Sequence, residues 1–75
     1  MKPIEFLNLN QKAKIKEIRG GKSFLKQIQN IGLRKGDEVQ MIQNRNYGPI
    51  IIKKDEFRVA LGRGMAHKIM VDALD

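Results

Sequence analysis

The chain has 75 residues, of which 41% are hydrophobic and 31% charged, and its formal net charge is +7. A chain of this length buries only about 60% of its unfolded surface, so we expect one domain, residues 1–75, with a small core. The absence of cysteine excludes disulfides and cysteine nucleophiles, and a single histidine leaves few ligands for zinc. The longest aliphatic run, residues 50–52, is far shorter than the ~20 residues of a membrane-spanning helix. The first residues also lack a signal-peptide pattern, so we expect a cytoplasmic location.

The positive charge is concentrated in the first half of the chain. Residues 1–36 hold nine Lys or Arg and two acidic residues, a net charge of +7. Residues 37–75 hold six of each and are neutral overall. This asymmetry indicates either an anionic partner (nucleic acid, anionic lipid or an acidic protein) or a solubilising surface.

The N-terminal third predicts an extended lead-in followed by a bulged strand. In residues 1–10 we expect the apolar side chains to cover one end of the core: Ile4, Phe6, Leu7 and Leu9. Residues 13–19 alternate apolar and charged side chains as far as Ile15, and Ile18 then breaks the period of two. A strand that ends in a bulge explains this change of phase. Gly20-Gly21 predicts a turn.

Residues 23–31 predict the one substantial helix. Phe24, Ile28 and Ile31 fall at positions i, i+4 and i+7, which is the spacing of a buried helical stripe. Ser23 is the expected N-cap, and Gly32 stands where a left-handed C-cap residue belongs.

From residue 33 onward the pattern favours short strands. We predict strands at residues 38–43, 50–52 and 57–61 and at the Ile69–Val71 alternation, with a polar loop at 44–49, tight turns at 34–37 and 55–56, and one helical turn at 62–66. In the 57–61 strand the inward residues are expected to be Phe57, Val59 and Leu61. Five short strands bury a core in so short a chain only if the sheet bends on itself. The predicted fold is therefore all-β, a small SH3-like barrel with one short helix after the first strand.

Two glycine-containing segments resemble phosphate-binding motifs. Gly20-Gly21-Lys22-Ser23 matches the end of a Walker A loop, but the pattern requires glycine at the position of Lys16. We interpret this segment as a turn and expect no tight nucleotide binding. We likewise interpret Gly62-Arg63-Gly64 as a turn rather than an anion-binding nest.

No metal, cofactor or catalytic site is predicted. His67 with Asp72 and Asp75 supplies too few ligands to define a transition-metal geometry, so we interpret His67 as a surface residue. The acidic pairs at 37–38 and 55–56 lie in turns, and nothing opposite them supplies a general acid. Of the four aromatic residues, only Tyr47 is expected to be free to stack on a base, which makes nucleic acid an unlikely partner.

The order of motifs along residues 9–71 resembles the FeoA family. The resemblance rests on 18–21 (Ile-Arg-Gly-Gly), 31–39 (Ile-Gly-Leu-Arg-Lys-Gly-Asp-Glu-Val), 47–50 (Tyr-Gly-Pro-Ile) and 59–71 (Val-Ala-Leu-Gly-Arg-Gly-Met-Ala-His-Lys-Ile-Met-Val). The resemblance implies an SH3-like barrel. It also implies a cytosolic, non-enzymatic accessory or regulatory role in bacterial ferrous iron uptake, through binding the FeoB membrane permease at its cytoplasmic GTP-binding region. The Asp55-Glu56 turn departs from the family, in which glycine is common there.

Two other functions remain open. One is a small-barrel nucleic-acid-binding module. The other is an accessory domain of a metal regulator, because the same domain type ends iron-dependent repressors of the DtxR type.

A basic patch around the helix is the candidate surface for the partner, and we expect the chain to be peripheral to the membrane at most. Its residues are Lys22, Leu25, Lys26, Arg34 and Lys35. Lys22 and Lys26 are four apart and so share a helical face, and Leu25 is the expected apolar anchor. The alternative is a solubilising face, with the contact made elsewhere on the protein.

Overall fold

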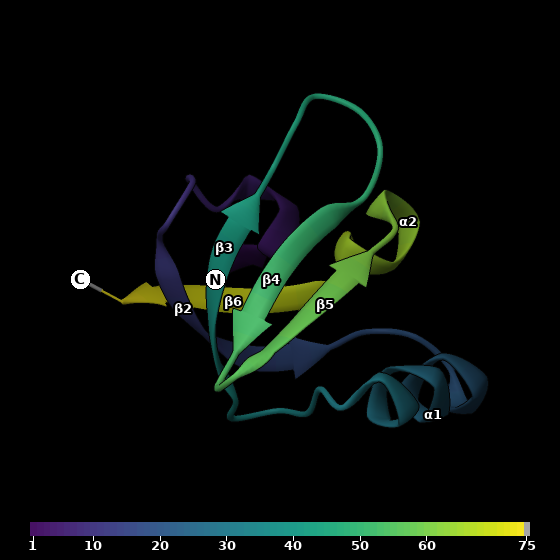
Figure 1. Cartoon of the computed structure of the whole chain (residues 1–75). Coiled ribbons are helices and arrows are strands. Elements are labelled where there is room, and N and C mark those ends of the chain that lie inside the picture. The colour runs from purple at the N-terminus through teal and green to yellow at the C-terminus, as the bar shows by residue number, and fades with distance from the viewer. Residues whose placement is uncertain (75) are drawn as a thin grey trace.

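A computed structural model describes residues 1–74 as one bent antiparallel sheet with its helices at the margins (Figure 1). The sheet order is β1-β6-β2-β3-β4-β5. The strands are β1 (Lys2–Pro3), β2 (Lys12–Ile18), β3 (Glu38–Gln43), β4 (Ile50–Lys54), β5 (Phe57–Leu61) and β6 (Ile69–Leu74). The helices are the 3-10 helix η1 (Ile4–Phe6), α1 (Lys22–Ile31) and α2 (Arg63–Ala66). In Figure 1, β2 and β6 cross behind β3, β4 and β5, so the sheet wraps around its own core.

The predicted strands are present, and the sheet has one more strand than expected. The missed strand is β1, in which Lys2 pairs with Val71 and Pro3 with Met70 of β6. Two residues carry no periodic signal, so this pairing is visible only in the tertiary structure. The predicted bulge is confirmed, because the β2–β6 register shifts between Ile15 and Glu17.

The core is aliphatic and receives side chains from every strand except β1. Its fully buried members, with at most 2% of their surface exposed, are Ile4, Leu7, Ala13, Ile15, Ile28, Leu33, Val39, Met41, Ile50, Ile52, Leu61, Ala66, Ile69 and Val71. Alternate residues of β2, β3 and β4 lie in this set, as the period of two requires.

The helix α1 begins one residue earlier than predicted and ends where predicted. Its N-cap is Gly21, with no side-chain hydrogen bond, so the assignment of Ser23 as N-cap is wrong. Gly32 takes a left-handed φ of 104° and donates to the carbonyl oxygen of Gln29, while Leu33 donates to that of Ile28. These two bonds form a Schellman motif, which stops the helix and directs Leu33 into the core.

Three apolar residues assigned to the core are instead exposed. Phe6 is 60%, Leu9 62% and Phe57 70% exposed. In η1 the three-residue turn aligns Ile4 with Leu7, and these two fill the end of the core. Phe57 shares the inner face of β5 with Val59 and Leu61, but it directly follows the turn and lies beyond the core.

Candidate functional site

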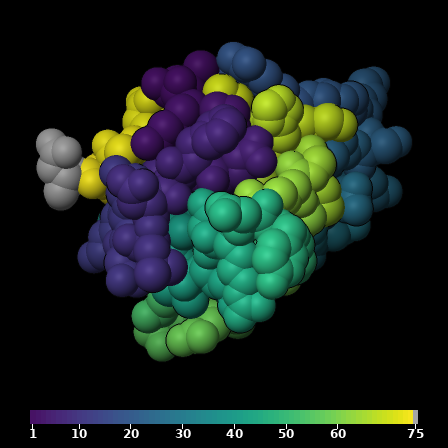
Figure 2. Space-filling view, turned by 90° about the horizontal axis from the view of Figure 1, so that it is seen from above, coloured from purple at the N-terminus to yellow at the C-terminus, as the bar shows by residue number. Residues whose placement is uncertain are grey.

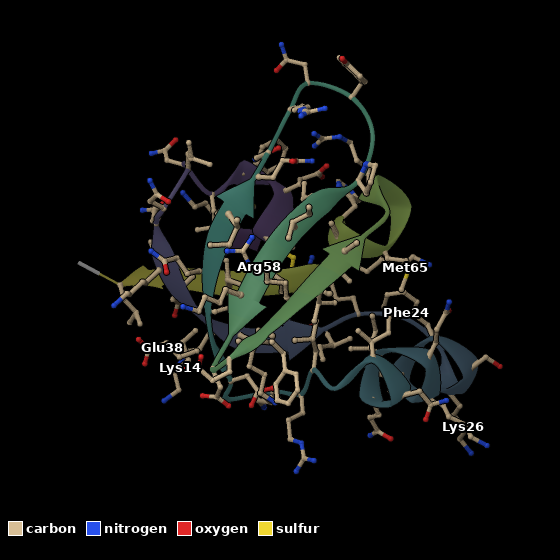
Figure 3. The ribbon with its side chains drawn as sticks, viewed as in Figure 1. Lys14, Phe24, Lys26, Glu38, Arg58 and Met65 are labelled. Atoms are coloured by element: carbon tan, nitrogen blue, oxygen red, sulfur yellow. The ribbon has the colours of Figure 1, made fainter. Side chains whose placement is uncertain are left out.

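The basic patch predicted from the sequence divides into two neighbouring parts. Lys22 and Lys26 are exposed on α1, and Figure 3 shows Lys26 at the outer side of the helix. Leu25, Arg34 and Lys35 instead line a hollow of about 190 Å³ between α1 and the segment that follows it. The other lining residues are Ile18, Gln29 and Leu33. The structure therefore brings the predicted apolar anchor together with two of the four predicted cations.

The helix carrying this surface is held against the barrel by its opposite face. Ile28 is fully buried, and Phe24 and Ile31 pack against the core as partly buried residues. Leu25 is half-buried, as expected for a residue beside the apolar stripe. The amphipathic pattern of α1 thus fixes which side chains remain available to a partner.

The segment 32–37 is held in place by a cation from the β4–β5 hairpin. Nζ of Lys54 donates to the backbone oxygen of Gly32 at 2.7 Å and pairs with Oδ2 of Asp37 at 2.9 Å. The same carboxylate oxygen accepts from the backbone N–H of Arg34 at 2.8 Å. These bonds give the turn with Arg34 and Lys35 one backbone conformation, so the two cations project from a fixed support.

The patch carries uncompensated positive charge. No residue of α1 is acidic. Within residues 1–74, none of the four cations of the patch forms an ion pair. The neighbouring Arg19 is paired with Glu17 at 3.3 Å. An acidic partner surface would supply the missing counter-charges, with Leu25 and the hollow receiving an apolar side chain.

A second polar cluster joins three segments at the other end of the barrel. Nδ2 of Asn44 donates to the backbone oxygens of Glu5 at 2.7 Å and Leu7 at 3.1 Å. Oδ1 of Asn44 accepts from Nη2 of Arg63 at 3.0 Å. In Figure 2 the N-terminal segment (purple), the loop after β3 (teal) and α2 (yellow-green) share this face. Asn44 thus connects the loop to η1 and α2, a role that the sequence analysis missed because its partners are distant in the chain.

His67 belongs to this cluster and not to an acidic C-terminal group. Its Nδ1 lies 2.6 Å from Oε1 of Glu5, and its side chain is 69% exposed. Asp72 pairs with the N-terminal ammonium at 3.2 Å, and Asp75 lies outside the described residues. Among residues 1–74, no three His, Asp or Glu side chains are grouped closely enough to hold a metal ion.

The two glycine-containing segments are turns that begin helices. Gly20 and Gly21 lead from β2 into α1, and Gly62 is the N-cap of α2. The acidic pair Asp55-Glu56 forms the β4–β5 turn, in which Asp55 takes a positive φ of 52°. Primed hairpin turns require such a φ at their first central residue, and aspartate tolerates this conformation better than most residues other than glycine and asparagine.

More aromatic residues are exposed than predicted. Tyr47 is 74% exposed, as expected, but Phe6 and Phe57 are exposed as well. Phe57 follows the turn at the lower end of the sheet in Figure 1, whereas the loop with Tyr47 lies at the upper end. These side chains do not form a single base-stacking surface beside the basic patch.

Replacing Asn44 by alanine should lower the free energy of unfolding by about 2 kcal/mol. The change removes two hydrogen bonds to backbone carbonyls and one from Arg63, and each contributes about 0.5–1.5 kcal/mol. Urea denaturation measures the effect. Asn46→Ala, an exposed position in the same loop, is the control and should change stability by less than about 0.5 kcal/mol. Equal stability of the two variants would show that the cluster does not hold the loop.

Comparisons with known proteins agree with this architecture. A family model described as the FeoA domain matches residues 2–73. A protein of Methanocaldococcus jannaschii, provisionally named Fe(2+) transport protein A, is 33% identical over 72 residues, which cover 96% of this chain and 87% of the relative. A crystal structure described as the iron uptake regulatory protein FeoA has a TM-score of 0.90 at 30% identity and covers 96% of each chain. The zinc-bound FeoA of Stenotrophomonas maltophilia, described as a prokaryotic SH3 domain protein, has a TM-score of 0.70 at 23% identity over 92% of this chain and 87% of that one.

The bent six-stranded sheet, the single long helix and these structural relatives define a small SH3-like barrel, which confirms the predicted fold. The match along residues 2–73 and the 33% identity also confirm the predicted family. The chain belongs to the FeoA family. Within residues 1–74, no helix is both long and apolar enough to cross a membrane.

Proposed function

We propose that this chain is a cytoplasmic, non-enzymatic accessory protein of ferrous iron uptake that acts by binding a FeoB-type permease through its cytoplasmic GTP-binding region. Membership of the FeoA family and the Fe(2+) transport name of a relative support the pathway. The observation that carries the binding role is the patch beside α1, in which an apolar hollow has unpaired cations around it. A protein surface with an apolar anchor and a charged margin is typical of a docking site.

The two parts of the patch have different roles in binding. Lys22 and Lys26, exposed at the margin, attract an acidic surface over several ångströms and raise the association rate. Leu25 and the hollow exclude water once contact is made and so slow dissociation. The Lys54–Asp37 pair holds the backbone of Arg34 in the free protein, which limits the backbone entropy lost on association.

Binding kinetics to the purified cytoplasmic domain of the permease test this proposal. The double change Lys22→Glu with Lys26→Glu should slow association about tenfold at low salt, with the difference shrinking as salt screens the charges. Leu25→Ala should speed dissociation about five- to tenfold with little salt dependence. The matched control, Lys12→Glu with Arg45→Glu, makes the same net charge change at exposed positions outside the patch.

The control separates a specific surface from general charge attraction. If both double variants slow association equally, net charge and not this patch governs the encounter. If folded Lys22→Glu with Lys26→Glu and Leu25→Ala proteins bind with unchanged kinetics at low salt, the patch is not the interface. An electrophoretic shift of DNA or RNA by the wild-type chain at physiological salt would favour the nucleic-acid function instead.

A further inference from the structure

One edge of β5 has no neighbouring strand. On its other edge, β4 pairs with it through a two-residue turn, in which Lys54 faces Phe57. The residues flanking such a turn exchange both of their hydrogen bonds, and the ladder then alternates along the strand. The N–H and C=O groups of Arg58 and Ala60 therefore point away from β4. No backbone hydrogen bond from another part of residues 1–74 reaches these four groups, so the edge offers two donors and two acceptors.

The outer face of this edge carries like charges directly opposite each other. Arg58 is the cross-strand partner of Lys53, and Lys53 in turn pairs with Gln40. Like charges placed opposite across two strands are destabilising. Neither cation forms an ion pair with a described residue, although Glu38 and Asp55 line the hollow of about 330 Å³ that Lys53 also lines. A carboxylate on the open side of Arg58 would relieve this repulsion.

The inner face of the same edge is apolar and incompletely covered. Phe57 is 70% exposed, and Val59 is only partly buried against the core. Phe24 of α1 and Met65 of α2 are also partly buried, and Figure 3 shows both on the side of β5 away from β4. An added strand would place apolar side chains beside this row.

We propose that β5 accepts an extended segment of a partner protein as a seventh strand, with acidic and apolar residues alternating along it. Successive side chains of a strand point to opposite faces, so one such segment places carboxylates beside Arg58 and apolar groups beside Phe57 and Val59. A second copy of this chain fits less well, because both copies carry a net charge of +7 and the edge of β5 itself presents a cation. This surface shares no residue with the patch at α1, although Lys54, the cross-strand partner of Phe57, contacts the segment 32–37 beside that patch. The proposal does not depend on the function of the patch.

A synthetic peptide in which valine and glutamate alternate over eight residues is a direct probe. In the free protein, hydrogen exchange measured by NMR should be fast at the amides of Arg58 and Ala60 and slow at those of Val59 and Leu61. On addition of the peptide, exchange at Arg58 and Ala60 should slow at least tenfold, and chemical-shift changes should centre on residues 57–61. A peptide that alternates valine and lysine, and one with four valines followed by four glutamates, should leave these signals unchanged.

Two pairs of variants test the backbone and the charge separately. Ala60→Pro removes an N–H that is not part of the β4–β5 ladder, and prolines are tolerated on edge strands, so the fold should persist while peptide affinity falls about five- to tenfold. Ala60→Val keeps that N–H and should bind within twofold of wild type. Arg58→Glu should weaken binding at least tenfold, whereas Arg45→Glu, the same charge change in an exposed loop, should have less than a threefold effect.

Several results would overturn the proposal. Slow exchange at Arg58 and Ala60 in the dilute free protein would show that the edge is already paired. Equal binding of the valine–lysine peptide, or shifts centred on α1 that disappear in Lys26→Glu, would place the peptide elsewhere. Protection of these amides that rises with protein concentration alone would identify a second copy as the occupant. Displacement of the peptide by a single-stranded oligonucleotide, with shifts on 57–61, would assign the edge to nucleic acid.

Discussion

Ile28→Ala is expected to lower the free energy of unfolding by about 2–5 kcal/mol. Ile28 is fully buried, and it is the central residue of the stripe by which α1 packs on the barrel. Removing three side-chain carbons leaves a cavity that a small and rigid aliphatic core closes only in part. Because a domain of this size has a total stability of about 4–11 kcal/mol, a large fraction of it would be lost.

Thermal and urea denaturation of the variant measure this effect. Gln29→Ala, at the next and exposed position of α1, is the matched control and should change stability by less than about 0.5 kcal/mol. Ile28→Val should lie between the two, at about 0.5–1.5 kcal/mol, which keeps the comparison measurable if the alanine variant does not fold. If Ile28→Ala were as stable as Gln29→Ala, α1 would not be held by its apolar stripe.

Gly20→Ala is expected to cost about 3 kcal/mol for two reasons that act together. Gly20 has a φ of +136°, a conformation that residues with a Cβ rarely adopt and that costs about 1–3 kcal/mol. A Cβ at this position would also lie 2.8 Å from Cδ2 and 3.2 Å from Cβ of Phe24. Phe24 would have to leave its place against the core, where Nζ of Lys68 also lies 4.8 Å from its ring centre.

The adjacent glycine is a matched control for this change. Gly21 has a φ of −80°, and a Cβ built on it meets no atom within 4 Å. Gly21→Ala should therefore lower the free energy of unfolding by at most about 1 kcal/mol, because alanine is a poorer N-cap than glycine but meets no clash or backbone strain here. Chemical denaturation compares the two variants, and NMR shifts of Phe24 report whether the ring has moved. Equal destabilisation of both would mean that the steric and backbone argument for Gly20 is wrong.

The two proposed surfaces assign different parts of the chain to binding. The patch at α1 uses side-chain charge and an apolar hollow, whereas the edge of β5 uses backbone hydrogen bonds. Changes at Lys26 should therefore affect only the first surface and Ala60→Pro only the second. The substitutions at both surfaces leave the core residues unchanged, so they separate effects on binding from effects on folding.

The sequence alone predicted the parts of the structure that depend on local periodicity. The alternation in residues 57–61 and the helical spacing of Phe24 and Ile28 identified β5 and α1, because a buried face requires one repeat or the other. Gly32 marked the end of α1, since its φ is unfavourable for other residues. The candidate residues Leu25, Arg34 and Lys35 were also named from the sequence and do share one hollow, although their role in binding is still a prediction.

Only the tertiary structure decided the features that depend on contacts distant in the chain. It added β1 as a partner of β6, joined Asn44 to Glu5 and Arg63, and left Phe57 outside the core. It also placed β5 at the open end of the sheet. The order of the strands, the identity of the edge strand and the extent of the core depend on which segments contact one another once the sheet bends. Local periodicity in the sequence carries no information about these long-range contacts.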